Sequence, residues 1–355
     1  MRKFTFQRLD VLESLGITPL TLVTDEQIWT ELFTPMTRAL LGDILDFTRG
    51  IRETVEGDFP GDQVSNLNNH LLYGGQSGFV RFPYHSTVYR TTNGAFVVKR
   101  DGVKVKAFGW FGDYKNGNAE LIFMCALRDR RFDGTKRAND TALLDFEFDD
   151  PTYNSRLAID GKPIDASACE LSAYCFMPGS RIVDATGDAE FDQFVEKPFT
   201  FLDRPELFLK LFWRAWNTKR SPGQNAVPIP DVSKLLLPAF ARIARKLGYD
   251  FIQNAPSHYH VALWTRKYGY DYVDPAQAKV MAELAAGIKR LKANGVKLTR
   301  SQESWVCVLQ SLREDLIPEE LKMHGPKWPQ DNITQENLWM YQPLHDGAKQ
   351  LFPKK

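Results

Sequence analysis

The chain has 355 residues, which corresponds to about two domains of ordinary size. Hydrophobic residues make up 43% and charged residues 25% of it, and this excludes a disordered chain, a coiled coil and a collagen-like fibre. Lys and Arg number 45 and Asp and Glu 44, so the net charge of +1 does not support nucleic-acid binding by bulk charge, although a local basic patch would still allow it.

Cysteine usage and the absence of long apolar stretches indicate a reducing, aqueous location. All four cysteines have apolar neighbours and no C-x-x-C pair occurs, so we expect buried reduced thiols rather than disulfides or a zinc site. No signal-peptide-like stretch follows Met1, and no stretch approaches the roughly 18 apolar residues of a membrane span. We therefore expect a cytoplasmic protein with no membrane partner. These features leave the oligomeric state open.

Residues 1–78 are predicted to form a helical N-terminal segment. Thr24 and Gln27 have capping-box spacing, and apolar residues follow at helical intervals as far as Leu41. A second helix is expected over residues 41–55, before a loop rich in Gly and Asp.

Residues 79–178 have the pattern of a largely antiparallel sheet. Two β-rich runs, 94–100 and 103–111, flank Asp101-Gly102, a dipeptide typical of tight hairpin turns. Three further strands are expected, at residues 119–127, 143–149 and 169–177.

Helices return after residue 178 and alternate with short strands. The expected elements are a buried helix at 205–219, a helix at 231–247 kinked or restarted at Pro238 and ended by Gly248, a strand at 249–252, a helix at 261–267 and a strand at 270–272.

The last part of the chain is again predicted to be helical. Asp274 and Pro275 open one helix, and Thr299 and Gln302 have capping-box spacing ahead of another that reaches Leu316. A polar tail on the surface is expected after Pro318. The predicted fold class is α+β: a central mixed, mainly antiparallel sheet in an α/β core at 79–272, between helical segments at 1–78 and 273–355.

The predicted order of elements in residues 231–272 is helix, Gly, strand, polar turn, helix, Gly-aromatic and strand. The sequences at the two helix ends are Leu247-Gly248-Tyr249 and Tyr268-Gly269-Tyr270. This pattern resembles the C-terminal half of GNAT-type N-acetyltransferases. The hairpin at 94–111 is similar to that family's second and third strands, so 119–127 would be its central fourth strand, which splays from the fifth. The resemblance implies acyl transfer from acetyl-CoA or another acyl-CoA to an amine, on a small molecule or a macromolecule.

The family's pyrophosphate loop has the pattern [Q/R]-x-x-G-x-[G/A], in which loop amides attract phosphate. Two segments match it in part, one through Arg131 and Gly134 and the other through Arg220 and Gly223, and both lack the final small residue. The resemblance thus implies cofactor-binding roles for these four residues. Thr265 stands where the family has its usual catalytic tyrosine. His258 or Glu120 is then the candidate base for the attacking amine, directly or through water.

A different chemistry is suggested by Asp145, Glu147 and Asp149, which alternate with phenylalanines so that three carboxylates share one strand face. The Asp-x-Glu pair is similar to the metal motif of primase-polymerases, and implies a metal-dependent nucleotidyltransferase as an alternative. The opposing interpretation is a surface strand with its acidic side in water, metal-free, and we expect this arrangement.

Two further patterns have both functional and structural interpretations. His258 and His260 could share one face of a strand as a metal pair, or be loop histidines of which one is a base. Trp213 and Trp216 lie in a stretch that also contains basic residues, and they could stack on nucleic acid or belong to a helix core. A third function class, a non-enzymatic binding or assembly protein such as one of viral origin, fits the incompleteness of each catalytic pattern.

Overall fold

The computed structural model describes residues 19–41, 51–56, 85–90, 94–101, 104–113, 118–129, 158–159, 162–164, 166–175, 185–226, 231–328 and 338–352. These residues belong to two compact units. Unit 1 comprises Met1–Pro178, Ile229–Ile252 and Pro343–Lys355, and unit 2 comprises Gly179–Pro228 and Gln253–Gln342. The unit boundaries differ from those of the three segments expected from the sequence. Each unit is described by itself.

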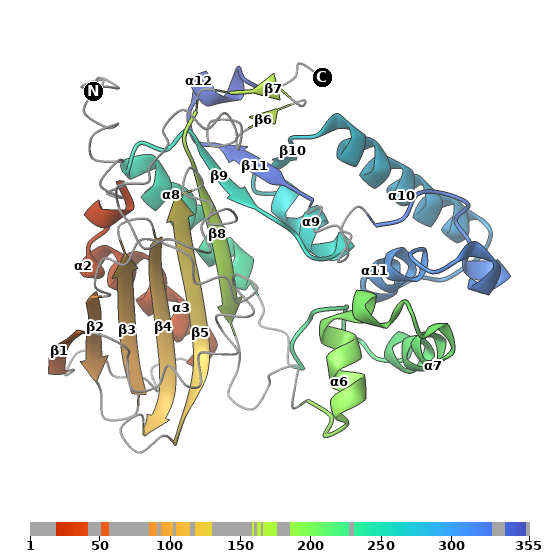
Figure 1. Cartoon of the computed structure of the whole chain (residues 1–355), viewed down its shortest axis with the longest axis horizontal. Coiled ribbons are helices and arrows are strands. Elements are labelled where there is room, and N and C mark those ends of the chain that lie inside the picture. The colour runs from red at the N-terminus through yellow and green to blue at the C-terminus, as the bar shows by residue number, and fades with distance from the viewer. Residues whose placement is uncertain are drawn as a thin grey trace, which may run out of the picture. The chain divides into compact units, whose positions relative to one another are not determined.

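Unit 1 is built on a twisted sheet whose strands follow one another in chain order (Figure 1). The strands are β1 (Ile51–Glu56), β2 (His85–Arg90), β3 (Gly94–Asp101), β4 (Lys104–Asp113), β5 (Asn118–Asp129), β8 (Ala168–Cys175) and β9 (Phe251–Asn254), whose second half belongs to unit 2. Neighbours from β1 to β8 pair antiparallel. Two short strands, β6 (Ala158–Ile159) and β7 (Lys162–Pro163), form a separate pair. The predicted fold class, α+β with a mixed and mainly antiparallel sheet, is confirmed.

The hairpin predicted around Asp101-Gly102 is present, with its turn one residue further along. Asp101 is the last residue of β3 and pairs with Lys104, the first residue of β4. The two connecting residues are therefore 102 and 103 rather than 101 and 102. Strands predicted at 119–127 and 169–177 correspond to β5 and β8. The acidic run 143–149 lies outside the described residues.

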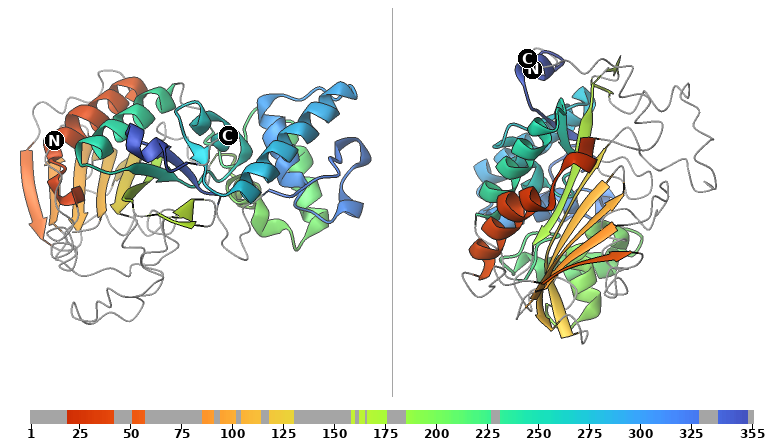
Figure 2. Two further views of the ribbon diagram at one scale, coloured as in Figure 1. Left: turned by 90° about the horizontal axis from the view of Figure 1, so that it is seen from above. Right: turned by 90° about the vertical axis from the view of Figure 1, so that its left-hand side faces the viewer.

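One face of the sheet is covered by helices from two distant parts of the chain. Figure 2 shows α2 (Asp25–Ile28), α3 (Thr34–Leu41) and α8 (Val232–Lys246) on the same side of the strands. A small apolar cavity between them is lined by side chains from both layers, among them Ile28, Leu127 and Phe240. The core of unit 1 is thus the layer between these helices and strands β3 to β5.

The N-terminal helix is continuous from α2 to α3 through a π-helical turn, η2 (Trp29–Phe33). Pro35 explains that turn, because proline has no N–H to donate and its ring excludes the carbonyl four residues earlier. The Thr30 hydroxyl donates to the Glu26 carbonyl over 2.7 Å. Phe33 packs on Phe96 with ring centroids 4.1 Å apart, and a Cβ at Gly109 would come within 2.5 Å of the Phe33 ring. Gly109 therefore lets the helix approach the sheet closely.

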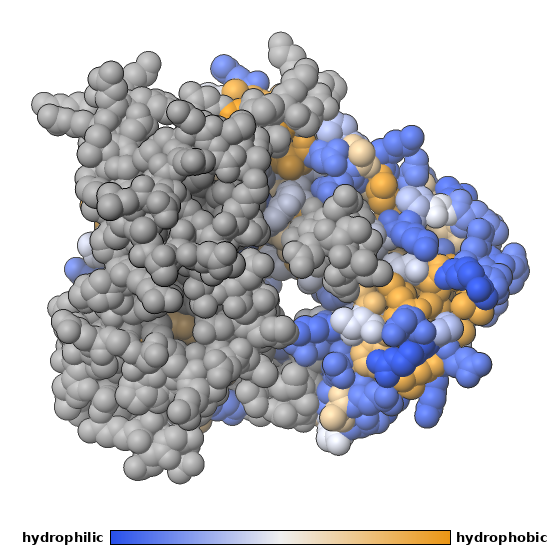
Figure 3. Space-filling view, viewed as in Figure 1, coloured by the Kyte–Doolittle hydropathy of each residue, from blue (hydrophilic) through white to orange (hydrophobic). Residues whose placement is uncertain are grey.

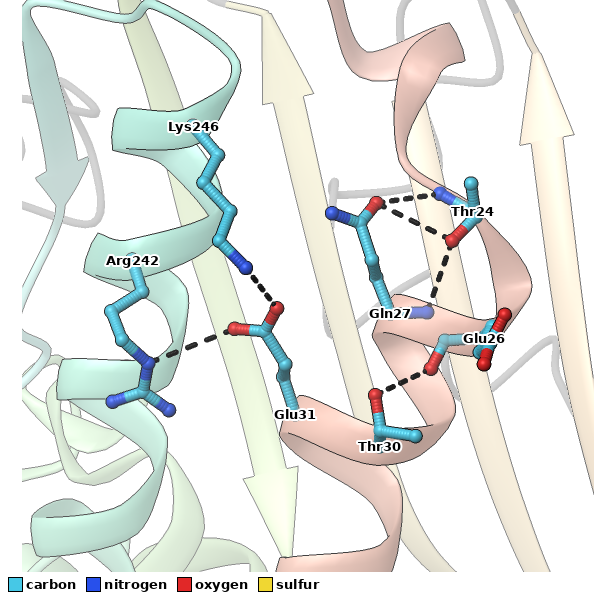
Figure 4. A network of polar contacts seen from close by, with 7 residues as sticks. All are labelled: Thr24, Glu26, Gln27, Thr30, Glu31, Arg242 and Lys246. Carbon is cyan, nitrogen blue, oxygen red and sulfur yellow. Dashed lines mark hydrogen bonds and ion pairs between the residues drawn. The ribbon is translucent and has the colours of Figure 1, made fainter.

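Polar contacts cap the start of the N-terminal helix and join this helix to α8 (Figure 4). The predicted capping box is present: Thr24 Oγ1 accepts from the Gln27 amide at 3.1 Å, and the Gln27 side chain accepts from the Thr24 amide at 3.0 Å. Glu31 forms an ion pair with Lys246, with Oε1 and Nζ 2.6 Å apart, and a longer one with Arg242, with Oε2 and Nε 3.7 Å apart. The N-terminal helix is thereby joined to α8.

The expectation of a helix over 41–55 is wrong for residues 51–56, which form β1. The run contains the β-branched residues Ile51, Thr54 and Val55, and all six residues of β1 pair with β2. The hydrogen bonds of that ladder come from a segment 29 residues away at the Glu56–His85 pair and 39 residues away at the Ile51–Arg90 pair, so local pattern alone did not reveal them. The N-terminal segment is therefore not wholly helical.

Unit 2 is mainly helical. Its elements are α6 (Ala189–Glu196), the 3-10 turn η7 (Pro198–Phe201), α7 (Pro205–Trp216), α9 (Tyr259–Arg266), α10 (Pro275–Ala293), α11 (Arg300–Leu309) and the antiparallel strands β10 (Asp271–Tyr272) and β11 (Met340–Pro343). Phe194, Phe208, Phe212 and Trp305 are fully buried and form the aromatic core. Figure 3 shows hydrophobic residues gathered over α7 and α11, among hydrophilic ones.

Two predictions for unit 2 need correction. The helix at 205–219, expected to be buried on most sides, is amphipathic: Phe208, Phe212 and Ala215 are buried, whereas Trp213 is 39% exposed. The tail after Pro318, expected on the surface, includes the buried residues Trp328 and Leu338 and strand β11, because pairing with β10 satisfies its backbone groups.

Helix ends agree with the sequence. Gly248 and Gly269 follow α8 and α9 with φ of 84° and 88°, Asp274 caps α10, and Thr299 with Gln302 forms the capping box of α11. The α8 helix runs through Pro238 rather than restarting there. No helix among the described residues is long and apolar enough to cross a membrane.

Candidate functional site

The structure brings three of the predicted site residues together in unit 2. Arg220 and Gly223 belong to the loop after α7, and that loop contacts His258 at the start of α9. Glu120 lies half-buried on β5 in unit 1. Arg131 and Gly134 lie outside the described residues. The Arg220 loop and the two histidines at the start of α9 therefore define the site described below.

Gly223 allows the loop to touch the imidazole of His258. Its φ is 70°, and a Cβ on it would come within 2.7 Å of both Cδ2 and Nε2 of His258. Its amide donates to the Val195 carbonyl at 2.7 Å. Two features therefore require glycine at this position: the positive φ of its backbone and the close contact of that backbone with the His258 ring. Its N–H is already hydrogen-bonded within the protein.

Arg220 is likewise engaged in holding the loop together. Its guanidinium donates to the Gln224 carbonyl from Nε at 3.3 Å and from Nη2 at 3.0 Å. Its own carbonyl accepts from Trp305 Nε1 at 3.0 Å and from the Ser301 hydroxyl. Partial burial lowers the pKa of Arg220, and the nearby Asp192 opposes that shift. Binding of a pyrophosphate here would require these hydrogen bonds to be exchanged.

His258 is the N-terminal cap residue of α9 and is only 4% exposed. Its ring stacks on Phe199 with centroids 5.8 Å apart and on His260 with centroids 6.1 Å apart, the latter within 7° of parallel. Nδ1 is buried and has no hydrogen-bond partner among the described residues. Burial, and secondarily His260, hold the pKa of His258 well below its usual range, so the ring is neutral at pH 7.

His260 has a different environment although it is two residues away. Its Nδ1 is hydrogen-bonded to Ser304 Oγ at 3.0 Å, and Ser304 is fully buried on α11. Burial and the positive charge of Arg300 lower the pKa of His260 to about 4. The two histidines lie at the start of a helix, not on a strand as a metal pair would require here.

Thr265, at the position of the tyrosine in the family that the sequence resembles, is fully buried. Its hydroxyl donates to the Ala262 carbonyl at 3.1 Å and contacts Met340 Sδ at 3.4 Å. Thr265 thus has a structural role within α9.

Metal binding finds no support in the part of the chain that the structure describes. There is no group of three or more His, Cys, Asp or Glu residues that could hold an ion in it. All four cysteines are free and buried, as expected, and burial raises the pKa of the Cys125 thiol to about 12 and the pKa of each of the others well above its usual range. Asp145, Glu147 and Asp149 lie outside the described residues.

Two members of this site were not identified from the sequence, namely Phe199 and Ser304. Ser304 is 44 residues from His260 along the chain, and Phe199 stands in an aromatic run like others in this sequence. No local pattern links either of them to the histidines. No protein-family model, no curated protein and no solved structure matches this chain.

Proposed function

We propose that this protein transfers an acyl group from coenzyme A to an amine. The observation that supports the proposal is the order of elements from α8 to β10. A helix ends at Gly248, a strand follows, a second helix ends at Gly269, and a strand follows again, with both glycines at positive φ. The hairpin β3–β4 and the next strand, β5, agree with the other half of the same resemblance.

One feature departs from the expected acyltransferase arrangement. The strand predicted to splay from its neighbour, β5, is paired along both edges, with β4 and with β8. The seven pairs with β8 run from Phe123–Cys175 to Asp129–Cys169. A groove for the acyl donor is therefore not located at the edges of β5, and the proposal rests on the order of elements rather than on a splayed strand.

The proposal gives named residues specific parts in the reaction. Loop amides at Gly134 or Gly223 would hold the pyrophosphate of the acyl donor. Because the amide of Gly223 already has a protein partner, the Arg131–Gly134 loop is the better of the two candidates. The amine would lose its proton to a carboxylate such as Glu120, directly or through water.

Ligand-dependent thermal stabilisation tests the proposal. The full chain is heated alone, with acetyl-CoA, with free coenzyme A, with Mg²⁺ or Mn²⁺ plus nucleotides, and with single-stranded DNA. A ligand at 100 times its Kd stabilises by about 2.7 kcal/mol, which is a readily measured rise in Tm. We expect acetyl-CoA and coenzyme A to raise the Tm. Stabilisation by Mn²⁺ with nucleotides alone would instead favour nucleotidyl chemistry, and no response to any ligand would contradict the proposal.

A matched pair of variants identifies the loop. If the Arg131 loop binds the pyrophosphate, Arg131→Ala abolishes the shift with coenzyme A, whereas Arg220→Ala lowers the Tm of the free protein but keeps the ligand-induced shift. The reverse pattern would assign the site to the Arg220 loop. Release of free thiol from acetyl-CoA in the presence of amines of different size then identifies the class of acceptor.

A further inference from the structure

The C-terminal half of α7 presents two tryptophans at the surface of unit 2. Trp213 is 39% exposed, Trp216 is partly exposed, and their ring centroids lie 5.9 Å apart with the ring planes at 73°. On the buried side of the same helix, Phe208 and Phe212 belong to the core. An indole left in water forgoes the energy that burial of a large aromatic side chain supplies. Trp213 therefore offers an aromatic surface that a ligand can contact.

Two basic segments of unit 2 meet beside these tryptophans. Residues 207–226 contain four basic residues and no acidic one, and residues 284–302 contain five basic residues and no acidic one. The second segment includes the start of α11, which packs on α7. The side-chain amide of Gln302 donates to the Trp216 carbonyl at 3.3 Å. Basic residues of both segments therefore lie near the exposed aromatic rings.

Several of these cations have no counter-charge in the protein. Arg214 pairs with Asp188, and Lys292 pairs with Glu303. Four others are exposed and form no ion pair with any described residue, namely Lys210, Lys219, Lys297 and Arg300. Like charges held close together repel one another, so an anionic ligand that neutralises them is bound favourably.

The groups that oppose an anion at this surface are fewer. The one acidic side chain of α7 is Glu206, in the first turn of the helix and two turns before Trp213. The C-terminus of α7 carries the negative end of a helix dipole. The N-terminus of α11, where Arg300 is the first residue, carries the positive end of another and offsets it. The surface around the two tryptophans is therefore positive on balance.

We propose that the exposed ends of α7 and α11 bind single-stranded nucleic acid, with a base stacked on Trp213 and the phosphates neutralised by the four unpaired cations. Bases stack on exposed aromatic side chains without regard to sequence, and lysine and arginine follow the phosphate backbone. A run of acidic residues would use the cations and leave the indole unused, and a duplex keeps its bases stacked inside the helix. A single strand uses both parts of the surface. The inference does not depend on the proposed acyl transfer.

Fluorescence anisotropy of a labelled oligothymidylate of about ten nucleotides, titrated with the full chain, tests the inference. We expect a Kd of about 1–100 µM at physiological salt, as for sequence-independent binding. The plot of log Kobs against log salt should have a slope of about −3 if all four cations contact phosphates. An abasic strand of the same length keeps the phosphates and loses the stacking, so it should bind about 5- to 100-fold more weakly.

Substitution of Trp213 separates stacking from charge. Trp213→Ala should weaken binding of oligothymidylate about 5- to 100-fold and leave binding of the abasic strand unchanged, so that the two strands bind nearly alike. Trp213→Phe keeps an aromatic ring and should retain most of the affinity. Leu235→Ala is the matched control, because Leu235 is 37% exposed but belongs to unit 1, and it should leave the affinity unchanged.

Charge variants keep the inference testable if a tryptophan variant fails to fold. Lys219→Ala and Arg300→Ala should each weaken binding of both strands and reduce the magnitude of the salt slope by about 0.7. Lys267→Ala removes an exposed cation at the C-terminal end of α9 and should change neither quantity. Urea denaturation shows which variants keep the fold.

Three results would overturn the inference. Equal binding of oligothymidylate and the abasic strand by the wild type would exclude stacking on the tryptophan. Binding of a polyglutamate peptide as tight as that of oligothymidylate, with the same loss in Lys219→Ala, would make the surface one for an acidic protein. Absence of binding by either strand at about 50 mM salt would exclude a nucleic-acid site.

Discussion

Gly223 occupies a position where backbone and packing both exclude a side chain. Its φ is 70° and its α-carbon faces the His258 ring. The change Gly223→Ala adds a left-handed backbone penalty to a forced displacement of His258, so we expect the free energy of unfolding to fall by roughly 2–4 kcal/mol. Gly187→Ala is the matched control, because Gly187 has φ of 74° and nothing within 4 Å of an added Cβ, and should lose only about 1–2 kcal/mol. Urea denaturation measures both, and equal losses would contradict the packing argument.

The two buried histidines make stability depend on pH. Their pKa values in the folded protein lie below 6.5, that of His260 at about 4, so between these limits the unfolded chain binds more protons than the folded one. Stability is therefore retained above about pH 6.5 and lost as the pH falls toward 4, by about 1.4 kcal/mol for each unit that separates the folded and unfolded pKa values.

The measurement that checks this pH dependence is urea denaturation of wild type and of the double variant His258→Phe/His260→Gln from pH 7 to pH 4.5. We expect the wild type to lose more stability on acidification than the variant, because the variant lacks both groups. Arg300, whose charge also depresses the His260 pKa, is unchanged in both proteins. Parallel profiles would show that the two imidazoles do not resist protonation.

At the scale of a single element, the start of α11 depends on two side chains. Thr299 Oγ1 accepts from the Gln302 amide at 3.2 Å, and Gln302 accepts from the Thr299 amide at 3.0 Å. Removal of the cap in Thr299→Ala should cost about 0.5–2 kcal/mol, whereas Thr299→Ser keeps the hydroxyl and should cost little. The free energy of unfolding from urea titration is the measurement. A loss in Thr299→Ser as large as in Thr299→Ala would assign the effect to the threonine methyl group instead.

In unit 1 the segment after β11 is held against the start of β9 by one carboxylate. Asp250 accepts from the Ser167 amide and hydroxyl at 2.7 and 3.0 Å and is hydrogen-bonded to His345 Nε2 at 2.8 Å. The Leu344 amide donates to the Asp250 carbonyl at 2.9 Å. His345 Nδ1 in turn caps α12 (Asp346–Lys349) by accepting from the Ala348 amide. These contacts give Ser167, Asp250 and His345 structural roles.

At the largest scale, when a whole unit unfolds, β5 should be the most stable strand of unit 1. It pairs on both edges, and its residues from Leu121 to Leu127 are all buried. Amides that open only on unfolding of the whole unit exchange slowest, so we expect hydrogen-exchange mass spectrometry to find peptides covering 121–127 the most protected. Strand β1, at one end of the strand order, should exchange at least about tenfold faster. Equal protection of β1 and β5 would mean that the sheet opens only as one unit.

The sequence predicted much of the fold and only part of the candidate site. The residue types of His258, Gly223 and Arg220 singled them out, and the structure brings these three together. Their roles could not be read from the sequence. The Gly223 amide and the Arg220 guanidinium are engaged by neighbouring carbonyls, and Phe199 and Ser304, which fix the two imidazoles, come from distant segments. Such partners depend on how helices pack, which no local pattern encodes.

Features that depend on residues a few positions apart were determined by the sequence itself. These include both capping boxes, the positive-φ glycines after α8 and α9, the β3–β4 hairpin and the buried thiols. The tertiary structure alone decided the strand at 51–56, the pairing of β5 with β8, the burial of the tail around Leu338 and the surroundings of His258 and His260. The physical reason is the range of the interactions: a cap or a turn is closed by neighbouring groups, whereas a strand partner or a buried imidazole acquires its energy from segments that folding brings together.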